Sequence, residues 1–494
     1  MHSPYGIWSV IPPLVAIVLA IKTRKVFVAL GAGIWMAYLV MDHGHPIKAF
    51  YDAVEALVKV FQSPGNTRTI MFSALVGALI LFIQKSGGVA GFVYRTEQWL
   101  EKHMQGRSPR KVVQLAAWLT GVVIFVETSI SALTVGTVFR PLFDRLGISR
   151  EKLAYIADSS SAPTSVLIPF NAWGAFVMGL LLTEGLDKPF GRLLAAIPYN
   201  FYPILALLLV LVVIWFDWNI GPMRRAEERV RRTGRLLNED ARPLVSEALT
   251  AVDPVGRPPY RARNMLVPLA VMIGMMPVLL VATGWDKARE LHPGAKGPER
   301  LFYALGEGSG STAVLFAVIT ALAVAMIMYR LQGIATFGEM NDWILKGISE
   351  MMPLALLMMM AFATGKVTKE LGTGLYLAGL AGEWLHPGFI PFIIFLLAAF
   401  IAFATGTSWG TFAIMIPIAV PMAQQLDVSL SLALAAVLSG GVFGDHASPV
   451  SDTTIISSMA AATDLIDHVK TQLPYALISA SLAALLFLLF GFLA

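Results

Sequence analysis

Runs of about 20 apolar residues recur along the chain and are separated by short polar or basic segments. The clearest runs cover 7–21, 198–216, 264–283, 311–329, 388–404 and 474–494. A helix of this length crosses the ~30 Å hydrocarbon core of a bilayer, and the runs lack the alternation of barrel strands. The pattern therefore predicts an all-α polytopic membrane protein with roughly twelve to fourteen passes or half-passes.

Composition agrees with this fold class and excludes several functions. Of the 494 residues, 56% are hydrophobic and only 14% are charged, against roughly 25% charged residues in soluble proteins. The chain has no cysteine, which excludes disulfides, thiol catalysis and iron–sulfur clusters. The net charge of +5 resides in loops, as the positive-inside rule requires, so we expect no nucleic-acid partner.

Loop charge predicts the topology in the cell inner (plasma) membrane. No basic region precedes the first apolar run, so 7–21 is expected to be a retained helix. Lys22, Arg24 and Lys25 place the next loop in the cytoplasm and the N-terminus outside. The arginine-rich segment 217–263 is expected to be a cytoplasmic linker, helical around 223–236. It separates an N-terminal membrane half, 1–216, from a C-terminal half, 264–494.

Two polar motifs recur in the same order in both halves, offset by about 280 residues. The first half contains F-V-E-T-S-I-S-A-L-T from Phe125 and D-S-S-S-A-P-T-S-V-L-I-P from Asp158. The second contains F-A-T-G-T-S-W-G-T-F from Phe403 and G-D-H-A-S-P-V-S-D-T-T from Gly444. They predict repeats at about 68–185 and 350–465, whose interface holds the site of a secondary transporter. The sequence leaves open whether the repeats are inverted or parallel.

The polar motifs interrupt helices that should cross the membrane. Proline removes a hydrogen-bond donor and breaks a helix, and Pro163 and Pro449 lie inside these motifs. A carboxylate at bilayer depth costs several kcal/mol and generally faces a binding cavity, which favours functional roles for Glu127, Asp445 and Asp452. Oxygen-rich broken helices suit hard cations, and half-helix N-termini suit organic carboxylates. These arguments do not choose between the two ligands.

Several candidates keep a structural alternative. Serine and threonine hydroxyls often only bond back to a helix carbonyl, Asp158 could cap a helix break, and His446 could be a proton carrier or a structural residue. Trp173 and Trp409 either pack or line a pocket. The candidate ion- or substrate-binding residues are Glu127, Thr128, Ser129, Asp158, Ser161, Thr164, Ser165, Asn171, Thr405, Thr407, Ser408, Asp445, His446, Ser448, Ser451, Asp452, Thr453 and Thr454.

The motifs resemble the signature of the NhaC family of Na⁺/H⁺ antiporters, within the larger ion transporter superfamily. The resemblance rests on G-D-H-A-S-P-V-S-D-T-T-I-I-S-S (444–458), A-T-G-T-S-W-G-T-F-A-I-M-I-P-I-A (404–419), S-A-P-T-S-V-L-I-P-F-N-A-W-G (161–174) and T-K-E-L-G-T (368–373). It implies a homodimeric, elevator-like transporter with inverted repeats. Hairpin tips would lie at 127–129 and 405–408, and unwound segments at 158–165 and 444–454.

The leading hypothesis is Na⁺/H⁺ antiport by alternating access, without a cofactor. Asp445, Asp452, Thr407 and Ser408 would bind Na⁺, and protons would compete for the carboxylates. The alternative is Na⁺- or H⁺-coupled transport of a small carboxylate or amino acid, because resembling proteins handle malate, lactate or amino acids. An enzyme is not expected, since Asp445-His446 beside a serine is not a triad by spacing alone.

Overall fold

The computed structural model describes residues 4–23, 25–103, 109–125, 127–243 and 260–493. Within these ranges the chain forms helices and no β-strand. The helices before the linker are η1 (Gly6–Val10), α1 (Ile11–Thr23), α2 (Val26–Met41), α3 (Pro46–Lys59), η2 (Val60–Gln62), α4 (Pro64–Lys85), α5 (Gly88–His103), α6 (Pro109–Val123), α7 (Thr128–Arg145), α8 (Arg150–Leu167), α9 (Ala172–Thr183), α10 (Pro189–Ala196), η3 (Ile197–Tyr199) and α11 (Phe201–Phe216). The helix α12 (Gly221–Thr233) lies in the linker. Those that follow are α14 (Arg263–Leu291), α15 (Pro298–Glu307), α16 (Gly310–Leu331), α17 (Phe337–Leu371), α18 (Thr373–Trp384), η4 (Pro387–Phe389), α19 (Ile390–Thr405), α20 (Ser408–Gln425), α21 (Leu430–Ala447), α22 (Asp452–Ala461) and α23 (Leu465–Leu493).

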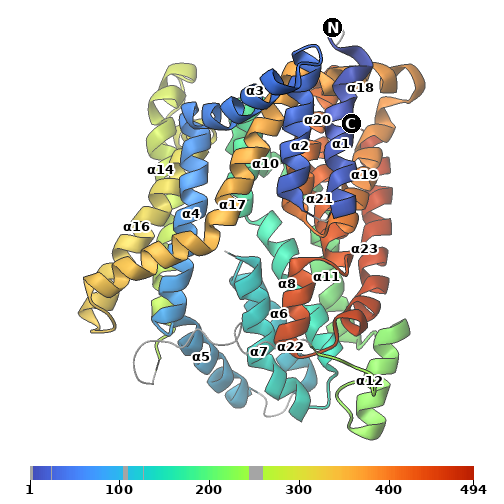
Figure 1. Ribbon diagram of the computed structural model, residues 1–494. Helices are drawn as coiled ribbons and strands as arrows, with labels where there is room; N and C mark the ends of the chain where they lie inside the picture. The colour runs from blue at the N-terminus through green and yellow to red at the C-terminus, as the bar shows by residue number, and fades with distance from the viewer. Residues whose placement is uncertain (1–3, 24, 104–108, 126, 244–259, 494) are drawn as a thin grey trace.

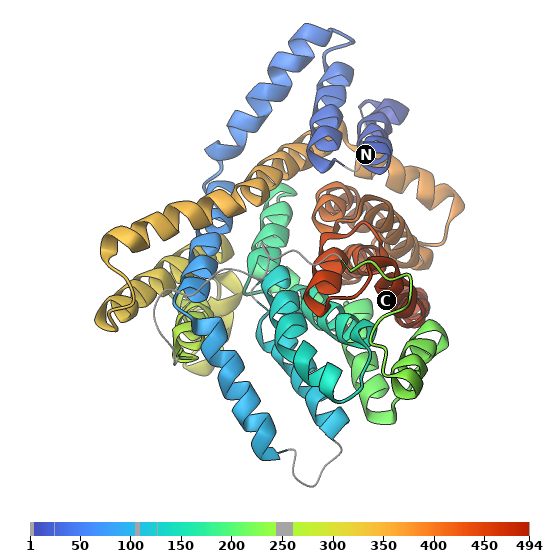
Figure 2. The same cartoon turned by 60° about the horizontal axis from the view of Figure 1, so that its bottom comes forward.

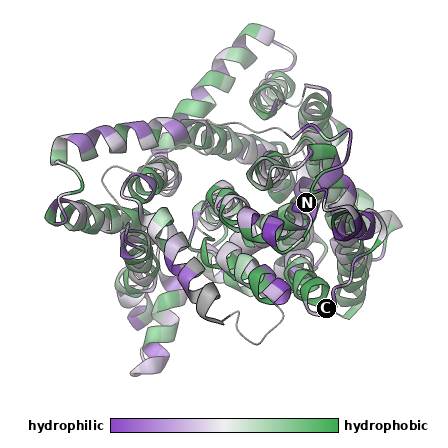
Figure 3. Cartoon of the chain, turned by 90° about the horizontal axis from the view of Figure 1, so that it is seen from below, coloured by the Kyte–Doolittle hydropathy of each residue, from purple (hydrophilic) through white to green (hydrophobic). Residues whose placement is uncertain are grey.

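Ten helical segments in the described ranges are long and apolar enough to cross a membrane. Each apolar run predicted from the sequence falls on one of them, so the prediction of an all-α polytopic membrane protein is confirmed. The view in Figure 3 shows hydrophobic residues along most helices. The higher number expected from the sequence included half-passes. Among the described residues, the α-helices outside the ten segments are α2, α3, α5, α6, α7, α10, α15, α18, α20 and α22, and of these α2 is a shorter apolar helix.

The long helices form two groups that lie on different sides of the molecule in Figures 1 and 2. The first helix group is α4, α14, α16 and α17, in which α17 packs along α4 and α14 packs along α16. The second helix group is α6, α7, α8, α11 and α19 to α23, joined by contacts of α7 with α8 and α22, and of α21 with α19 and α23. The helix α17 also touches α20 and α9, so the two groups meet along it.

Glycines allow close approach of helix backbones within each group. A Cβ on Gly77 of α4 would lie 2.2 Å from the carbonyl oxygen of Gly347 on α17. A Cβ on Gly444 of α21 would lie 2.3 Å from the carbonyl oxygen of Ala399 on α19. Small residues at such crossings increase van der Waals contact, which is the main source of helix association where water is absent.

Two pairs of helices in the two halves have equal lengths and a constant offset. The pair α7 and α20 spans 128–145 and 408–425, and the pair α8 and α21 spans 150–167 and 430–447, an offset of 280 at every bound. The helices α6 and α7 pack together, as do α19 and α20. Equal lengths support a repeat, while its inverted geometry stays a prediction.

The first helix break lies later in the chain than the sequence motif suggested. The segment 158–165, expected to be unwound, is helical, and α8 ends only at Leu167. Pro163 is tolerated inside α8, where the Thr164 hydroxyl donates to the Ser160 carbonyl oxygen at 2.7 Å. The break follows at 168–171, where Pro169 forces Ile168 into an extended conformation. Pro169, rather than Pro163, therefore corresponds to Pro449.

The second break is shorter than expected. Of the predicted unwound segment 444–454, only 448–451 is non-helical, because α21 continues to Ala447 and α22 begins at Asp452. Ser448, which precedes Pro449, is extended with φ −84° and ψ 131°. Each half of the chain thus places one helix C-terminus and one helix N-terminus around a proline.

Candidate ion and substrate site

A cavity of about 600 Å³ lies where four helices begin. Its walls include Thr128 at the start of α7, Ala172 at the start of α9, and Asp452 at the start of α22. Thr407, which precedes the first residue of α20, lies on the same wall. Helix N-termini carry a partial positive charge. The starts of α7, α9, α20 and α22 therefore all direct a partial positive charge at this cavity.

Three carboxylates line this cavity. Glu127 and Asp452 were expected from the sequence, and Glu350 of α17 was not. Glu127 caps α7, because its Oε2 accepts a hydrogen bond from the Ile130 N–H at 2.7 Å. Lys25 is the only basic residue among the described residues of the lining. Glu350 precedes Pro353 inside the apolar part of α17, and a carboxylate at such a position was the signal that could have identified it.

Two tryptophans form an aromatic wall in the same cavity. The rings of Trp173 and Trp409 lie 5.0 Å apart at 49°. Trp409 also packs against Phe176, and Trp173 packs edge-on against Phe412. Both alternatives considered for these tryptophans therefore apply, since the rings pack together and also line the cavity.

Asp445 lies buried behind this cavity and connects two helix N-termini. Its Oδ2 accepts hydrogen bonds from the Ser408 hydroxyl at 2.6 Å and from the Ser408 N–H at 3.3 Å. Its Oδ1 accepts a bond from the Ser451 hydroxyl at 2.5 Å. The Ser451 oxygen is also 3.0 Å from the Thr453 hydroxyl oxygen. This buried group of oxygens has the ligand type that hard cations prefer.

The described residues contain no group of three or more Asp, Glu, His or Cys side chains arranged to hold a metal ion. Any cation near Asp445 would therefore depend mainly on hydroxyl and carbonyl oxygens. Of the four expected Na⁺ ligands, Asp445 and Ser408 are in direct contact, whereas Thr407 and Asp452 line the open cavity. The Asp452 side chain is exposed in the cavity, and its Oδ1 accepts a hydrogen bond from the backbone N–H of Thr453 at 2.8 Å.

The position 280 residues earlier, in the first half of the chain, is neutral. Ser165, offset by 280 from Asp445, donates its hydroxyl to the Phe125 carbonyl oxygen at 3.0 Å. Asn171, offset by 280 from Ser451, donates to the same oxygen at 3.1 Å and to the Ser165 carbonyl at 2.8 Å. In both halves of the chain a proline break is thus hydrogen-bonded to the segment at or before the start of α7 or α20, but only the second half uses a carboxylate.

A second buried polar cluster surrounds Asp158. Its Oδ2 accepts hydrogen bonds from the Gln472 amide at 2.7 Å and from the Thr454 hydroxyl at 3.3 Å. His468 lies 3.4 Å and His446 3.9 Å from the same oxygen. His468 and Gln472 were missed because they occur singly near the start of α23, outside the polar motifs. Asp158 therefore does not cap a helix break but lies inside α8 in contact with α22 and α23.

His446 is held within this second cluster. Its Nε2 lies 3.0 Å from the Ser159 hydroxyl oxygen, and its Nδ1 lies 2.5 Å from the Tyr202 hydroxyl oxygen. All three side chains are buried. His446 adjoins Asp445 in the sequence, but its ring contacts the Asp158 cluster.

Four other candidate hydroxyls bond to backbone carbonyls. Ser161, Thr164 and Thr405 each donate to a carbonyl three or four residues earlier in their own helices. Ser448 donates to the Phe403 carbonyl at 2.7 Å and so joins the second break to α19. The remaining candidate, Ser129, lines the cavity beside Thr128.

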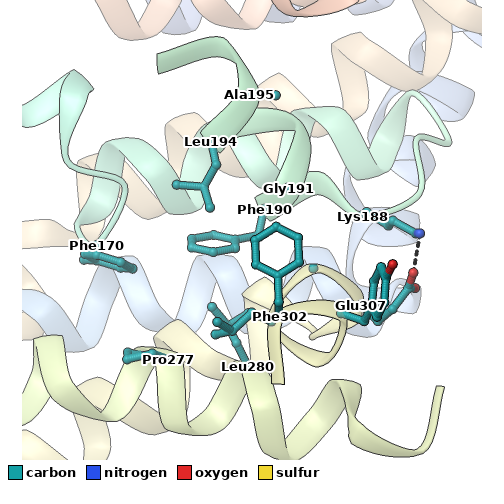
Figure 4. A pocket seen from close by; sticks show the side chains of 13 residues that line it. Phe170, Lys188, Phe190, Gly191, Leu194, Ala195, Pro277, Leu280, Phe302 and Glu307 are labelled. Atoms are coloured by element: carbon teal, nitrogen blue, oxygen red, sulfur yellow. Dashed lines mark ion pairs between the residues drawn. The ribbon is translucent and has the colours of Figure 1, made fainter. Parts of the chain in front are cut away.

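A separate cavity of about 590 Å³ lies between α10, α14 and α15. Its walls are largely apolar, with Phe170, Phe190 and Phe302 among them, and an ion pair of Lys188 with Glu307 lies at one end (Figure 4). None of the candidate residues predicted from the sequence lines it. The cavity at the four helix N-termini is therefore the candidate functional site.

Comparison with known proteins gives one match along the whole chain and several shorter ones. A model of the Na⁺/H⁺ antiporter family matches residues 299–492. An uncharacterized protein of Haemophilus influenzae is 34% identical, and the match covers 99% of this chain and 91% of that protein. A malate-2H⁺/Na⁺-lactate antiporter of Bacillus subtilis is 33% identical over 22% of this chain and 24% of its own length. An uncharacterized Na⁺/H⁺ antiporter of H. influenzae is 34% identical over 23% of this chain and 27% of its own length.

The fold resembles that of solved transporters. The YdaH transporter of Alcanivorax borkumensis superposes with a TM-score of 0.56 and 14% identity, over 90% of this chain and 89% of that one. At this identity the likeness concerns the fold alone.

Proposed function

Because this chain belongs to the Na⁺/H⁺ antiporter family, we propose that it exchanges Na⁺ for H⁺ across the membrane by alternating access. The observation that carries this proposal is the contact of Asp445 with Ser408 and Ser451. A buried carboxylate is joined there to the N-termini of α20 and α22, beside a cavity with three more carboxylates. Such an arrangement can hold a cation or a proton.

Competition at one carboxylate is sufficient to couple the two fluxes. Ionised Asp445 accepts hydrogen bonds from two hydroxyls and one N–H, and these donors stabilise the charged form. Na⁺ replaces the hydroxyl protons as the partner of the carboxylate when the hydroxyls rotate and present their oxygen lone pairs. A proton that binds Asp445 removes its charge and releases the ion. Only the Na⁺-loaded or the protonated form needs to cross between the two access states.

Asp452 and Glu127 attract cations from solution into the cavity. Both side chains lie at the cavity wall, one residue away from Ser451 and Thr128 respectively. A cavity with carboxylates and low-dielectric walls raises the local cation concentration. An ion that enters at Asp452 reaches Asp445 through the Ser451 and Thr453 hydroxyls, whose oxygens are 3.0 Å apart.

The two helix groups suggest how access alternates. Glu350 belongs to α17 of the first helix group, while Asp445 and Asp452 belong to the second. Movement of the second group along α17 would carry the ion site past a fixed wall, as in an elevator mechanism. A homodimer joined through the first helix group would hold that wall in place. Elevator movement, the homodimer and an inner-membrane location with an outside N-terminus are parts of this proposal.

The experiment uses purified protein in liposomes that contain a fluorescent pH indicator. We expect Na⁺ addition to the wild type to produce a pH change inside the vesicles, and Asp445→Asn to abolish it. Asp342→Asn is the matched control, because Asp342 is an exposed carboxylate on α17 outside the cavity. Wild-type exchange by Asp445→Asn, or no exchange by the wild type, would contradict the proposal.

A second candidate function is exchange of an organic solute coupled to Na⁺ or H⁺. It is favoured by the volume of about 600 Å³, which lies in the range of organic-ligand pockets. The relative in B. subtilis is named for organic acids as well as Na⁺ and H⁺. In this function Asp445 keeps the cation, and the solute occupies the cavity in front of it.

A further inference from the structure

We propose that the cavity binds a small organic molecule that carries an ammonium or guanidinium group, held between carboxylates of both helix groups. This inference rests on the proposed transport function and specifies what occupies the cavity in addition to the ion. It follows from four properties of the cavity: its size, its charge, the position of Glu350 and its paired tryptophans.

The size of the cavity exceeds what an inorganic ion needs. Organic-ligand pockets enclose roughly 300–1,000 Å³, and this cavity encloses about 600 Å³. The groups suited to hold Na⁺ lie behind it, where Asp445 contacts Ser408 and Ser451 at 2.6 and 2.5 Å. The ion site and the open cavity are therefore adjacent but distinct spaces, and the larger one has room for a solute.

The charge of the cavity selects a cationic group. Glu127, Glu350 and Asp452 line it, and Asp445 lies directly behind it. Against these four carboxylates stand the full charge of Lys25 and four helix N-termini, and each N-terminus contributes roughly half a positive charge. While Asp445 is ionised and holds no Na⁺, the balance is negative by about one charge. An organic anion would add to this excess, whereas an ammonium or guanidinium group offsets it.

Glu350 is placed to bind a solute rather than to stabilise the fold. It is exposed in the cavity and lies in the interior of α17, within a segment apolar enough to span the membrane. It makes no ion pair within 4 Å with a described residue. A carboxylate at this depth is costly and indicates a binding pathway. Because α17 belongs to the first helix group, a cation bound to both Glu350 and Asp452 would bridge the groups.

The tryptophan pair suits the same ligand. Trp173 and Trp409 line the cavity with ring centroids 5.0 Å apart. The face of a tryptophan attracts an ammonium or guanidinium group within about 6 Å and also packs against a carbon skeleton. The N-terminus of α9, which begins beside Trp173, can accept a carboxylate if the molecule also carries one.

The test measures thermal stabilisation of the purified full chain in detergent by two sets of ligands, in the presence of Na⁺. The amine set is arginine, lysine and putrescine, and the control set is lactate, malate and isobutyrate. A ligand that binds only the folded state raises the unfolding temperature with its concentration. We expect at least one amine to stabilise the wild-type protein. The apparent affinity for that amine should fall about tenfold or more in Glu350→Gln and should not change in Asp342→Asn. Glu350→Asp, which keeps the charge, should retain most of the affinity.

Na⁺-driven pH change is measured on the same preparation so that the two proposals can fail separately. Stabilisation by the control acids to the same degree, or equal amine affinity in Glu350→Gln and wild type, overturns the inference. Normal Na⁺/H⁺ exchange without any effect of the amines overturns it too and leaves the proposed function intact. Amine binding without Na⁺/H⁺ exchange supports the inference and contradicts the proposed function.

Discussion

The Asp445 carboxylate accepts a hydrogen bond of 2.6 Å from the Ser408 hydroxyl, and this contact joins the end of α21 to the start of α20. Hydrogen bonds to a charged group contribute about 1.5–3 kcal/mol. The same two side chains are the proposed inner ligands of Na⁺. The contact therefore links the helical hairpin to the proline break through the group that changes charge during transport.

Ser408→Ala should weaken Na⁺ binding more than it weakens folding. The substitution removes one oxygen ligand and one hydroxyl donor to Asp445 but leaves the carboxylate in place. We expect the Na⁺ concentration at half-maximal exchange to rise about tenfold, which corresponds to ~1.4 kcal/mol. Thr320→Ala is the control, because Thr320 is an exposed hydroxyl that bonds only to its own helix. An unchanged half-maximal concentration in Ser408→Ala would remove Ser408 from the ion site.

Gly77→Ala should destabilise the protein by separating α4 from α17. The added Cβ would lie 2.2 Å from the Gly347 carbonyl oxygen, so the two helices must move apart. Overpacking of this kind costs about 1–3 kcal/mol, and thermal unfolding in detergent measures it. In Gly274→Ala the new Cβ meets nothing within 4 Å, so this control should be neutral or slightly stabilising. Equal unfolding temperatures for both variants would contradict the close crossing.

Glu227→Gln should loosen the linker helix α12. Glu227 is buried, accepts a hydrogen bond from the Ser149 N–H at 2.8 Å and pairs with Arg110 at 2.7 Å. Loss of one partner from a buried ion pair costs about 3–5 kcal/mol, so limited proteolysis should cleave near α12 faster. The neighbouring Glu228 pairs with exposed Arg224, and such surface pairs contribute at most about 1 kcal/mol. Faster cleavage in Glu228→Gln than in Glu227→Gln would refute this role.

Glu307 should make stability depend on pH in acid. Its burial raises the pKa of the carboxyl group, but hydrogen bonds from Lys188 and Lys287 outweigh burial and hold the pKa below its ordinary value of 4.5. Because the folded state has the lower pKa, the stabilisation is complete above about pH 4.5. It is lost as the pH falls through the lower folded value. Unfolding temperatures of wild type and Glu307→Gln should therefore differ at pH 6 and converge below pH 4.5. A constant difference would contradict the ion pairs.

The sequence was sufficient for the membrane class and for the positions where polar residues interrupt the helices. The apolar runs are long enough to be unambiguous, and the offset of 280 residues recurs in the helix bounds. It did not identify which proline breaks α8, because Pro163 and Pro169 both lie in the polar motif that begins at Asp158. Only the backbone shows that hydroxyls within α8 compensate for the first and that the second ends the helix.

The parts of the site that the sequence did not reveal come from single residues on distant helices. Glu350, His468 and Gln472 lie outside the polar motifs, and only the packing of α17 and α23 brings them near the two clusters. Conversely, Ser161 and Thr405 belong to the motifs but use their hydroxyls within their own helices. Composition cannot separate these cases, because a hydroxyl that bonds back to its helix and one that binds an ion are the same residue type.

The central claim is that Na⁺ and H⁺ compete for the carboxylate of Asp445. The most direct test is the Na⁺ concentration at half-maximal exchange, measured in liposomes at a series of pH values with the wild-type protein. Competition for one proton predicts that this concentration rises about tenfold for each unit by which the pH falls in the acidic range, while the maximal rate at saturating Na⁺ stays constant. A half-maximal concentration independent of pH, with only the maximal rate changing, would contradict a shared site.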